Sequence, residues 1–234
     1  MKHRTGFLIL SAAVLCLLFS SRSVYPYSYS AWGSMTGAKT FAVNPFFYGG
    51  FDPEFSLTTE LVVGYGFSEV FDIYADLATL DLTPDSGYGG SWVMPRYDLG
   101  GNNILALQIG FYKEEGSTAS YIVPQYHLYK DGEIFTWEIN LGLNVPLDDA
   151  GSSLLYGVVA PVWKIVPNTL NLFLEIDPSY QMGDADDFIL TLVPGLCLGF
   201  GNEGQHQFCL GFPVSDLTEN EVSTTYAAWF WTSF

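Results

Sequence analysis

The chain has 234 residues, of which 25 are acidic and 8 basic, while only 14% are charged and 17% are aromatic. So acidic a chain excludes nucleic acid and anionic membrane surfaces as partners, because both attract basic patches. Few charges together with many Tyr, Phe, Trp and Gly residues favour short strands joined by tight turns.

The first residues have the pattern of a secretory signal peptide. A basic start, Lys2–Arg4, precedes an apolar run from Phe7 to Phe19. This run is too short to span a bilayer and has the length of a signal. We place the signal peptide at 1–23, with cleavage as late as residue 30 as the alternative, and one mature domain at 24–234. No later apolar run reaches the roughly 18 residues of a spanning helix.

The mature chain repeats a unit of strand, short turn, strand and acidic loop. The pattern predicts an all-β fold, an antiparallel transmembrane β-barrel of about 12 strands, an even number as in single-chain bacterial barrels. The expected strands are 39–48, 55–66, 70–80, 89–98, 103–113, 118–129, 133–145, 153–164, 169–181, 187–200, 205–214 and 222–234.

The connections between these strands alternate strictly between two kinds. The tight ones are 67–69, 100–102, 130–132, 167–168 and 201–204. The others carry acidic residues, namely Asp52/Glu54, Asp81/Asp85, Glu114/Glu115, Asp148/Asp149, Asp184/Asp186/Asp187 and Asp216/Glu219/Glu221. With the N-terminus in the periplasm, every tight turn would be periplasmic and every acidic loop extracellular.

Side chains alternate between an apolar and a polar face along each strand. Leu105, Leu107 and Ile109 share one face, whereas Gln108 and Gly110 share the other. Apolar side chains outward and polar ones inward are the barrel pattern. A secreted soluble β-sandwich, with its apolar faces turned inward, would show the same alternation and stays an alternative.

Four prolines interrupt the predicted strands, and each stands two residues before an aromatic ring on the apolar face. Since proline cannot donate in a ladder, we expect a β-bulge at each one. The three rings that precede tight turns would form a periplasmic aromatic girdle. The proline–ring pairs are Pro95/Tyr97, Pro124/Tyr126, Pro161/Trp163 and Pro178/Tyr180.

The segment Tyr65–Asp72 resembles the Gly-x-Ser/Thr-acidic turn of outer-membrane barrels. Together with the repeated Pro-x-aromatic strands, it makes the mature chain resemble the MetA-pathway phenol-degradation transporter family and related barrels. That resemblance implies passage of small molecules, including aromatic ones, and carries over no residue-level site.

Strand parity predicts which charges face the lumen. We expect Arg96 and Lys164 to pair with neighbouring carboxylates and to form a charged constriction, while the excess of acids attracts cations and repels anions. The alternative is that a hydrated interior merely tolerates these charges. The predicted lumen charges are Glu60, Asp72, Asp76, Arg96, Asp98, Glu138, Lys164, Glu175 and Asp177.

Cys197 and Cys209 flank the 201–204 turn and lie opposite each other on the inward face, so they form either a disulfide or two packed thiols. No further ligand points to a metal site, and we expect no cofactor. The mature chain has two histidines, His127 and His206. Neither has a Ser or Asp at a recognisable spacing, so we expect no enzymatic activity.

In the last strand, side chains alternate between the two faces up to the end of the sequence. From Val222 to Phe234 it is rich in aromatic residues, and it resembles the C-terminal strand of bacterial outer-membrane barrels. The resemblance implies that Phe234 belongs to the insertion signal read by the barrel-assembly machinery. In a closed barrel this strand would pair with the first one and remove the sheet edge.

These features place the protein in the bacterial outer membrane, in contact with lipid and, through bridging cations at the acidic loops, with lipopolysaccharide. We expect a narrow channel for passive diffusion of small molecules that favours cationic or neutral solutes. The alternatives are a structural or adhesion barrel with a plugged lumen, a barrel enzyme, and the soluble β-sandwich.

Overall fold

The computed structural model describes residues 33–51, 55–83, 86–114, 117–148, 152–183, 187–201, 206–215, 217 and 223–234. The expected signal peptide at 1–23 and its later cleavage point at residue 30 lie outside the described residues.

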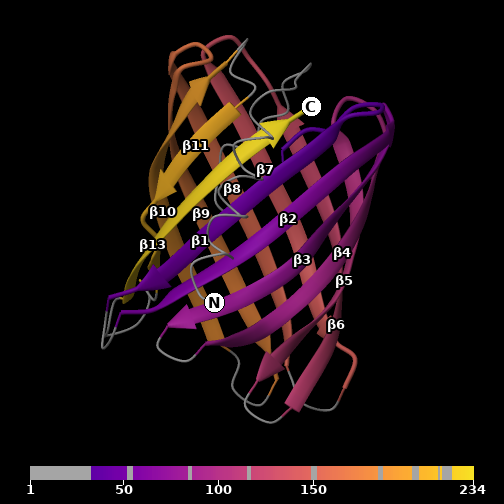
Figure 1. The fold of residues 1–234 in the computed structure, drawn as a ribbon, viewed down its shortest axis with the longest axis vertical. Helices are drawn as coiled ribbons and strands as arrows, with labels where there is room; N and C mark the ends of the chain where they lie inside the picture. Colours follow the sequence, from indigo (N-terminus) through magenta and orange to yellow (C-terminus); the bar gives the residue numbers. More distant parts are fainter. Residues whose placement is uncertain are drawn as a thin grey trace, which may run out of the picture.

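The described chain forms one closed antiparallel sheet (Figure 1). Strands β11 and β12 both pair with β10 and β13, so together they form one barrel strand. The barrel therefore has twelve strands, which confirms the predicted fold class and excludes the β-sandwich. The elements are β1 Phe41–Gly50, β2 Leu57–Ser68, β3 Phe71–Thr83, β4 Gly87–Asp98, β5 Asn103–Glu114, β6 Ser117–Lys130, β7 Phe135–Pro146, β8 Ser153–Val166, β9 Leu170–Met182, β10 Asp187–Phe200, β11 His206–Gly211, β12 Val214–Ser215 and β13 Ser223–Ser233.

The barrel closes where its last strand meets its first. Strand β1 pairs with β13 from Ala42↔Ser233 to Gly50↔Thr225. Beyond this ladder, the Phe41 N–H donates to the Phe234 carbonyl at 3.1 Å, and the Phe234 N–H donates to the Phe41 carbonyl at 2.8 Å. Their rings also stack, with centroids 6.4 Å apart. The terminal Phe234 is thus part of the seam that removes the sheet edge.

The two ends of the barrel differ. The turn end carries the start of β1, the end of β13 and the connections β2–β3, β4–β5, β6–β7, β8–β9 and β10–β11; the loop end carries the other six connections. All five connections predicted as tight turns lie at the turn end. Asn168, at φ 59°, takes the left-handed conformation in one of them, and the Thr169 N–H closes that turn onto the Val166 carbonyl at 3.0 Å.

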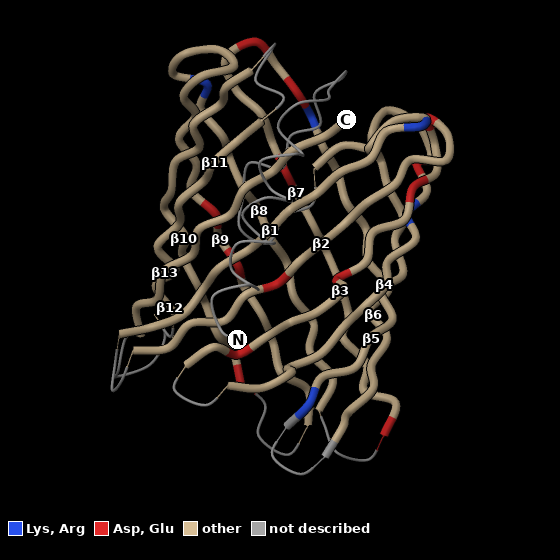
Figure 2. The backbone as a smooth tube through the Cα atoms, in the orientation of Figure 1, with Lys and Arg blue, Asp and Glu red and all other residues tan. Residues whose placement is uncertain are grey.

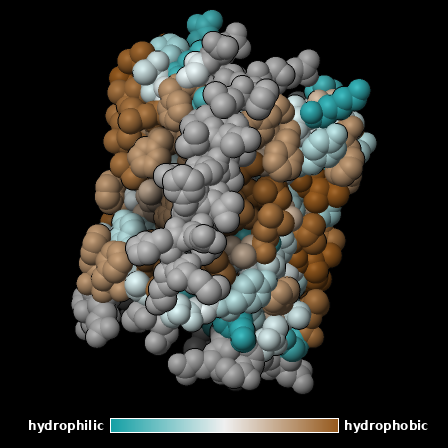
Figure 3. Space-filling view, viewed as in Figure 1, coloured by the Kyte–Doolittle hydropathy of each residue, from teal (hydrophilic) through white to brown (hydrophobic). Residues whose placement is uncertain are grey.

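The outer surface is apolar along the strands. Leu105, Leu107 and Ile109 are 47%, 40% and 43% exposed, although they lie in the middle of β5. Figure 3 shows apolar residues along the flanks of the barrel and more polar residues toward both ends. An apolar belt of this kind faces hydrocarbon in membrane barrels. None of the described residues forms a helix of the length and apolarity needed to cross a membrane.

The expected bulges at the prolines were wrong. Pro95 pairs with Ile73 of β3, while the β4–β5 pairing passes from Val93↔Ile109 to Arg96↔Ala106 without a change of register. Each proline nitrogen faces only one neighbouring strand, so the missing donor leaves a gap on that side alone and no extra residue is needed. Pro45, Pro124, Pro161, Pro178 and Pro194 show the same one-sided gap. The register shifts of the sheet lie elsewhere, in β2, β3 and β8.

Candidate functional site in the barrel interior

The predicted lumen charges fall into two groups. Asp98 and Lys164 lie at the turn end and fasten turns: the Asp98 carboxylate accepts the Gly100 N–H at 2.8 Å, and Lys164 Nζ contacts Asp131 Oδ1 at 2.6 Å. The others line the interior, where Asp72, Asp76, Arg96, Glu138 and Glu175 are buried and Glu60 and Asp177 are half-buried. Acidic positions therefore occur along the middle of the wall, whereas basic ones lie toward the ends (Figure 2).

Arg96 and Asp72 form a buried ion pair near the turn end. Arg96 Nε donates to Asp72 Oδ1 at 2.8 Å, and Arg96 Nη2 donates to Asp72 Oδ2 at 2.7 Å. Both side chains are at most 1% exposed. The guanidinium carbon also lies 4.5 Å from the ring centroid of Tyr74. This bidentate geometry compensates both charges inside the barrel.

The segment before β1 enters the barrel at this ion pair. The Thr36 N–H and hydroxyl both donate to Asp72 Oδ2, at 2.8 and 2.9 Å. Since the Thr36 hydroxyl donates there, the Tyr74 hydroxyl must donate to Thr36 Oγ1, at 2.6 Å. Arg96 Nη1 and Nη2 donate to the carbonyls of Gly33 and Ser34. Residues 33–36 are thus held inside the turn end of the barrel by the ion pair.

A glycine contact fixes the entry of this segment. Lys39 N–H donates to the Gly66 carbonyl at 2.7 Å, and the Gly66 N–H donates to the Thr40 carbonyl at 2.9 Å. A Cβ atom on Gly66 would lie 1.7 Å from the Gly37 carbonyl oxygen, so no other residue fits there without displacing the segment. Gly37 itself has φ +86°. Residue 66 lies in the turn motif quoted above, but its contact with residue 37 could not be inferred from that motif.

Four interior rings lie flat against glycines on the neighbouring strand. In each case the ring and the glycine are directly paired across the ladder: Tyr74 with Gly64, Tyr121 with Gly110, Tyr156 with Gly142 and Phe173 with Gly195. A Cβ on any of these glycines would lie between 2.1 and 2.7 Å from a ring atom. The glycines therefore let large side chains rest on the wall instead of crossing the lumen.

A chain of hydrogen bonds runs along β5 and β6 toward the turn end. Gln108 Nε2 donates to Tyr121 Oη at 3.1 Å, and Gln125 Nε2 donates to Gln108 Oε1 at 3.0 Å. The Gln125 carbonyl oxygen is therefore the acceptor for His127 Nε2, at 2.7 Å. His127 is then the Nε2–H tautomer, and its buried Nδ1 accepts no hydrogen bond from the described residues. These hydrogen-bonded side chains form a continuous polar track along one side of the interior.

Aromatic and aliphatic side chains pack the side of the interior nearest the seam. Trp229, 1% exposed, packs with Phe173, Phe46 and the cysteines; Trp231, also 1% exposed, packs with Tyr74, Met94 and their neighbours. Sequence reasoning used the alternation of this strand and its terminal Phe234 and did not consider the inward tryptophans. The signal was present, because both stand at inward parity.

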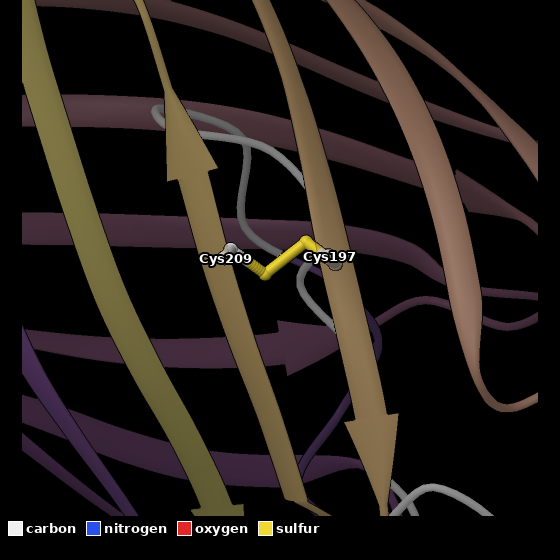
Figure 4. Close-up of a disulfide and its surroundings, with 2 residues drawn as sticks. All are labelled: Cys197 and Cys209. Carbon is white, nitrogen blue, oxygen red and sulfur yellow. A yellow bond between two sulfur atoms is a disulfide. The ribbon is translucent and has the colours of Figure 1, made fainter.

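The two inward cysteines lie within this packing. Cys197 and Cys209 are directly paired across β10 and β11 and form a disulfide with an S–S distance of 2.01 Å (Figure 4). Both are fully buried next to Trp229. Of the two arrangements left open by the sequence, the structure has the bonded one.

A cavity of about 350 Å³ occupies the loop-end half of the interior. It lies beyond the polar track, and its lining includes both Gln108 and Tyr121. The remaining side chains around it are aromatic or polar, with one carboxylate: Tyr48, Glu60, Thr79, Ser91, Trp92, Phe111, Tyr112 and Asn144. The cavity combines ring faces, amides and an acid, a set that can bind a polar organic molecule.

The second histidine lies away from this cavity. His206 Nδ1 contacts Thr232 Oγ1 at 2.7 Å, and the imidazole forms a cluster with the rings of Phe200 and Phe230 on the outward parity of β11. His127 Nε2 thus contacts an amide oxygen and His206 Nδ1 a hydroxyl. Among the described residues, no three His, Cys, Asp or Glu side chains are grouped so that they could hold a metal ion.

Comparisons with known proteins support the barrel and no more specific family. No protein-family model matches the chain, and no curated protein matches it by sequence. Among solved structures, the chain is similar to an outer membrane channel from Pseudomonas putida F1, with a TM-score of 0.60 and 9% identity over 86% of this chain and 97% of that one. It is also similar to the translocator domain of the autotransporter NalP from Neisseria meningitidis, with a TM-score of 0.50 and 11% identity over 98% of this chain and 94% of that one. At such identities the likeness is one of fold, and the chain has the fold of an outer membrane β-barrel.

Proposed function

We propose that this protein is a narrow channel of the bacterial outer membrane through which small molecules diffuse, with a preference for cationic and neutral solutes over anions. Its turn end would face the periplasm and its loop end the outside. The proposal includes outer-membrane lipid, lipopolysaccharide and the barrel-assembly machinery as partners, and it includes no catalytic step.

The proposal rests on the excess of acidic side chains in the interior. Six carboxylates, those of Glu60, Asp72, Asp76, Glu138, Glu175 and Asp177, face inward against the single guanidinium of Arg96. Counted over the described residues alone, the interior therefore carries an excess of negative over positive side chains, which favours a negative potential. A negative lumen concentrates cations and excludes anions.

Two further observations support a hydrated passage. The buried side-chain oxygens of Asn44, Asn171 and Gln207 accept no hydrogen bond from the described residues. Buried polar atoms of this kind are tolerated where water reaches them. In addition, the rings of Tyr121 and Tyr156 rest against glycines of the wall, and a cavity of about 350 Å³ lies in the loop-end half.

One observation favours a second candidate function, a structural barrel with a closed lumen. Residues 33–36, with Thr36 1% exposed, occupy the turn end and are tied to Asp72 and Arg96. A segment held this firmly could block the passage permanently. The two candidates differ in whether the folded barrel conducts.

The test is ion conduction by the mature chain in planar bilayers across a potassium chloride gradient. Folding is first checked by the faster migration of the unboiled sample on a denaturing gel. We expect discrete conductance with a reversal potential on the cation-selective side. An anion-selective pore would overturn the solute preference, and a correctly folded barrel without conductance would favour the structural candidate. Membrane fractionation on a density gradient tests the location. An outer-membrane protein must appear in the outer-membrane band.

A further inference from the structure

The cavity in the loop-end half combines aromatic side chains with an acid that forms no ion pair within the described part of the chain. Five aromatic residues line it, Tyr48, Trp92, Phe111, Tyr112 and Tyr121, together with the carboxylate of Glu60. Its volume of about 350 Å³ is that of a site for a small organic molecule.

The carboxylate is oriented but only partly satisfied. The Tyr48 hydroxyl donates to Glu60 Oε1 at 3.0 Å, and Glu60 forms no other hydrogen bond and no ion pair with the described residues. Its second oxygen is therefore available to a ligand. Tyr48 holds the carboxylate on the same strand pair, β1–β2, whose inward face borders the cavity.

A second carboxylate adds to the negative charge at this place. Asp76 is 2% exposed and interacts electrostatically with Glu60. The Thr79 hydroxyl at 2.7 Å and the Ala78 N–H at 3.1 Å donate to it, and no lysine or arginine among the described residues pairs with it. Buried charges are normally compensated, as Asp72 is by Arg96. Two adjoining acids without a cation favour a positively charged ligand.

The rings are placed to receive such a ligand. Tyr112 and Tyr121 lie with their centroids 6.0 Å apart and tilted by 35°. A Cβ on Gly110 would lie 2.6 Å from Tyr121 Oη and 2.8 Å from Trp92 Cβ, so the glycine allows both side chains to lie against the wall beside the cavity. Aromatic faces attract cations and also bind apolar groups.

We propose that this cavity binds a small organic ammonium ion that carries an aromatic or apolar group. The ammonium N–H groups donate to Glu60, and the apolar group packs against the tyrosine and tryptophan rings. This inference rests on the proposed function, because the cavity would be a binding site for organic cations within the channel. It lies between the loop end and the ion pair at the turn end. Arg96 is engaged there, so the described interior offers an organic anion no free guanidinium.

The test is calorimetric titration of the refolded mature barrel in neutral detergent with 2-phenylethylammonium, corrected for detergent alone. The neutral analogue 2-phenylethanol is titrated in parallel. We expect Glu60→Gln to weaken binding of the ammonium ion about tenfold or more, since it removes a charge-assisted hydrogen bond, and to leave binding of the alcohol unchanged. The matched control Glu133→Gln removes the same charge from an exposed residue at the turn end and should bind like the unmodified protein.

A second variant keeps the proposal testable if Glu60→Gln does not fold. Tyr48→Phe removes only the hydroxyl that orients the carboxylate and should weaken ammonium binding roughly two- to tenfold. Equal affinity of the Glu60→Gln and unmodified barrels, or binding of the alcohol as tight as that of the ammonium ion, would overturn the proposal. A barrel that conducts cations but binds no ammonium ion disproves this site alone, whereas one that binds the ion but does not conduct disproves the channel alone.

Discussion

Asp72 and Arg96, 24 residues apart in sequence, face each other across β3 and β4 and join two parts of the molecule. Their ion pair lies inside the barrel wall, and the same two side chains hold the backbone of residues 33–36 within the turn end. Wall stability and closure of the turn end are thus linked through one buried pair.

Removing either partner of this pair should destabilise the barrel strongly. We expect Asp72→Asn and Arg96→Met each to lower the free energy of unfolding by about 3–5 kcal/mol, because each leaves a buried charge uncompensated. The double variant should lose less unfolding free energy than the two single variants lose in sum. The pair of half-buried Lys164 with exposed Asp131 is the control, where Lys164→Met should cost about 1 kcal/mol or less. Denaturant titrations of the refolded barrel measure these values, and an additive double variant would contradict the coupling.

Gly66→Ala should open the turn end. The new Cβ would lie 1.7 Å from the Gly37 carbonyl oxygen, which forces the segment before β1 out of its position. Single-channel conductance should therefore rise relative to the unmodified protein. Gly87→Ala adds the same methyl group where nothing lies within 4 Å and should leave the conductance unchanged. Equal conductance of both variants would show that residues 33–36 do not limit the passage.

Gly142→Ala should narrow the lumen. A Cβ at this position would lie 2.3 Å from Tyr156 Cζ, so the ring must swing away from the wall into the interior. We expect lower conductance, restored when Tyr156→Ala is added. The control Gly157→Ala meets only ordinary contacts, the nearest at 3.4 Å. A Gly142→Ala barrel that conducts like the unmodified one would argue against the role of glycines in keeping the rings on the wall.

A charge on the outer face should cost most in the middle of the strands. Leu107→Arg, at the centre of β5, should lower the free energy of unfolding in lipid vesicles by about 2–4 kcal/mol, because arginine would face hydrocarbon. Ile134→Arg, exposed in the connection between β6 and β7, should cost only about 0–1 kcal/mol. Similar costs at the two positions would be inconsistent with a bilayer around β5.

The disulfide should add to stability without being needed for barrel closure. Each cysteine strand already pairs with a neighbour on both sides, so the register survives without the bond. We expect the Cys197→Ala/Cys209→Ala variant to remain heat-modifiable on gels and to lose at most about 3 kcal/mol of unfolding free energy. Maleimide labelling of the denatured, unreduced protein provides the check on the bond itself. Labelling of both cysteines before reduction would mean that it does not form.

Local patterns in the sequence determined the strands and their faces. The alternation of Leu105, Leu107 and Ile109 with Gln108 and Gly110 follows from the two-residue period of a strand, which needs no knowledge of the neighbours. Turn chemistry placed the tight connections in the same way, and the twelve barrel strands lie within a few residues of their predicted bounds, with the eleventh divided at Phe212 and Pro213 into β11 and β12. Even the inward position of Cys197 and Cys209 followed from hairpin parity.

What the interior contains was decided only by the tertiary structure. Parity gives the side of the wall on which a side chain lies, but not which groups meet across the strands or how deep each one lies. Consequently the Asp72–Arg96 pair, the return of residues 33–36 to that pair and the packing around Trp229 and Trp231 depended on register and closure of the whole sheet. The prolines show the same limit, since a one-sided ladder gap depends on which neighbour the proline nitrogen faces. A closed barrel fixes all these relations at once, because its twelve strands share a single register around one interior.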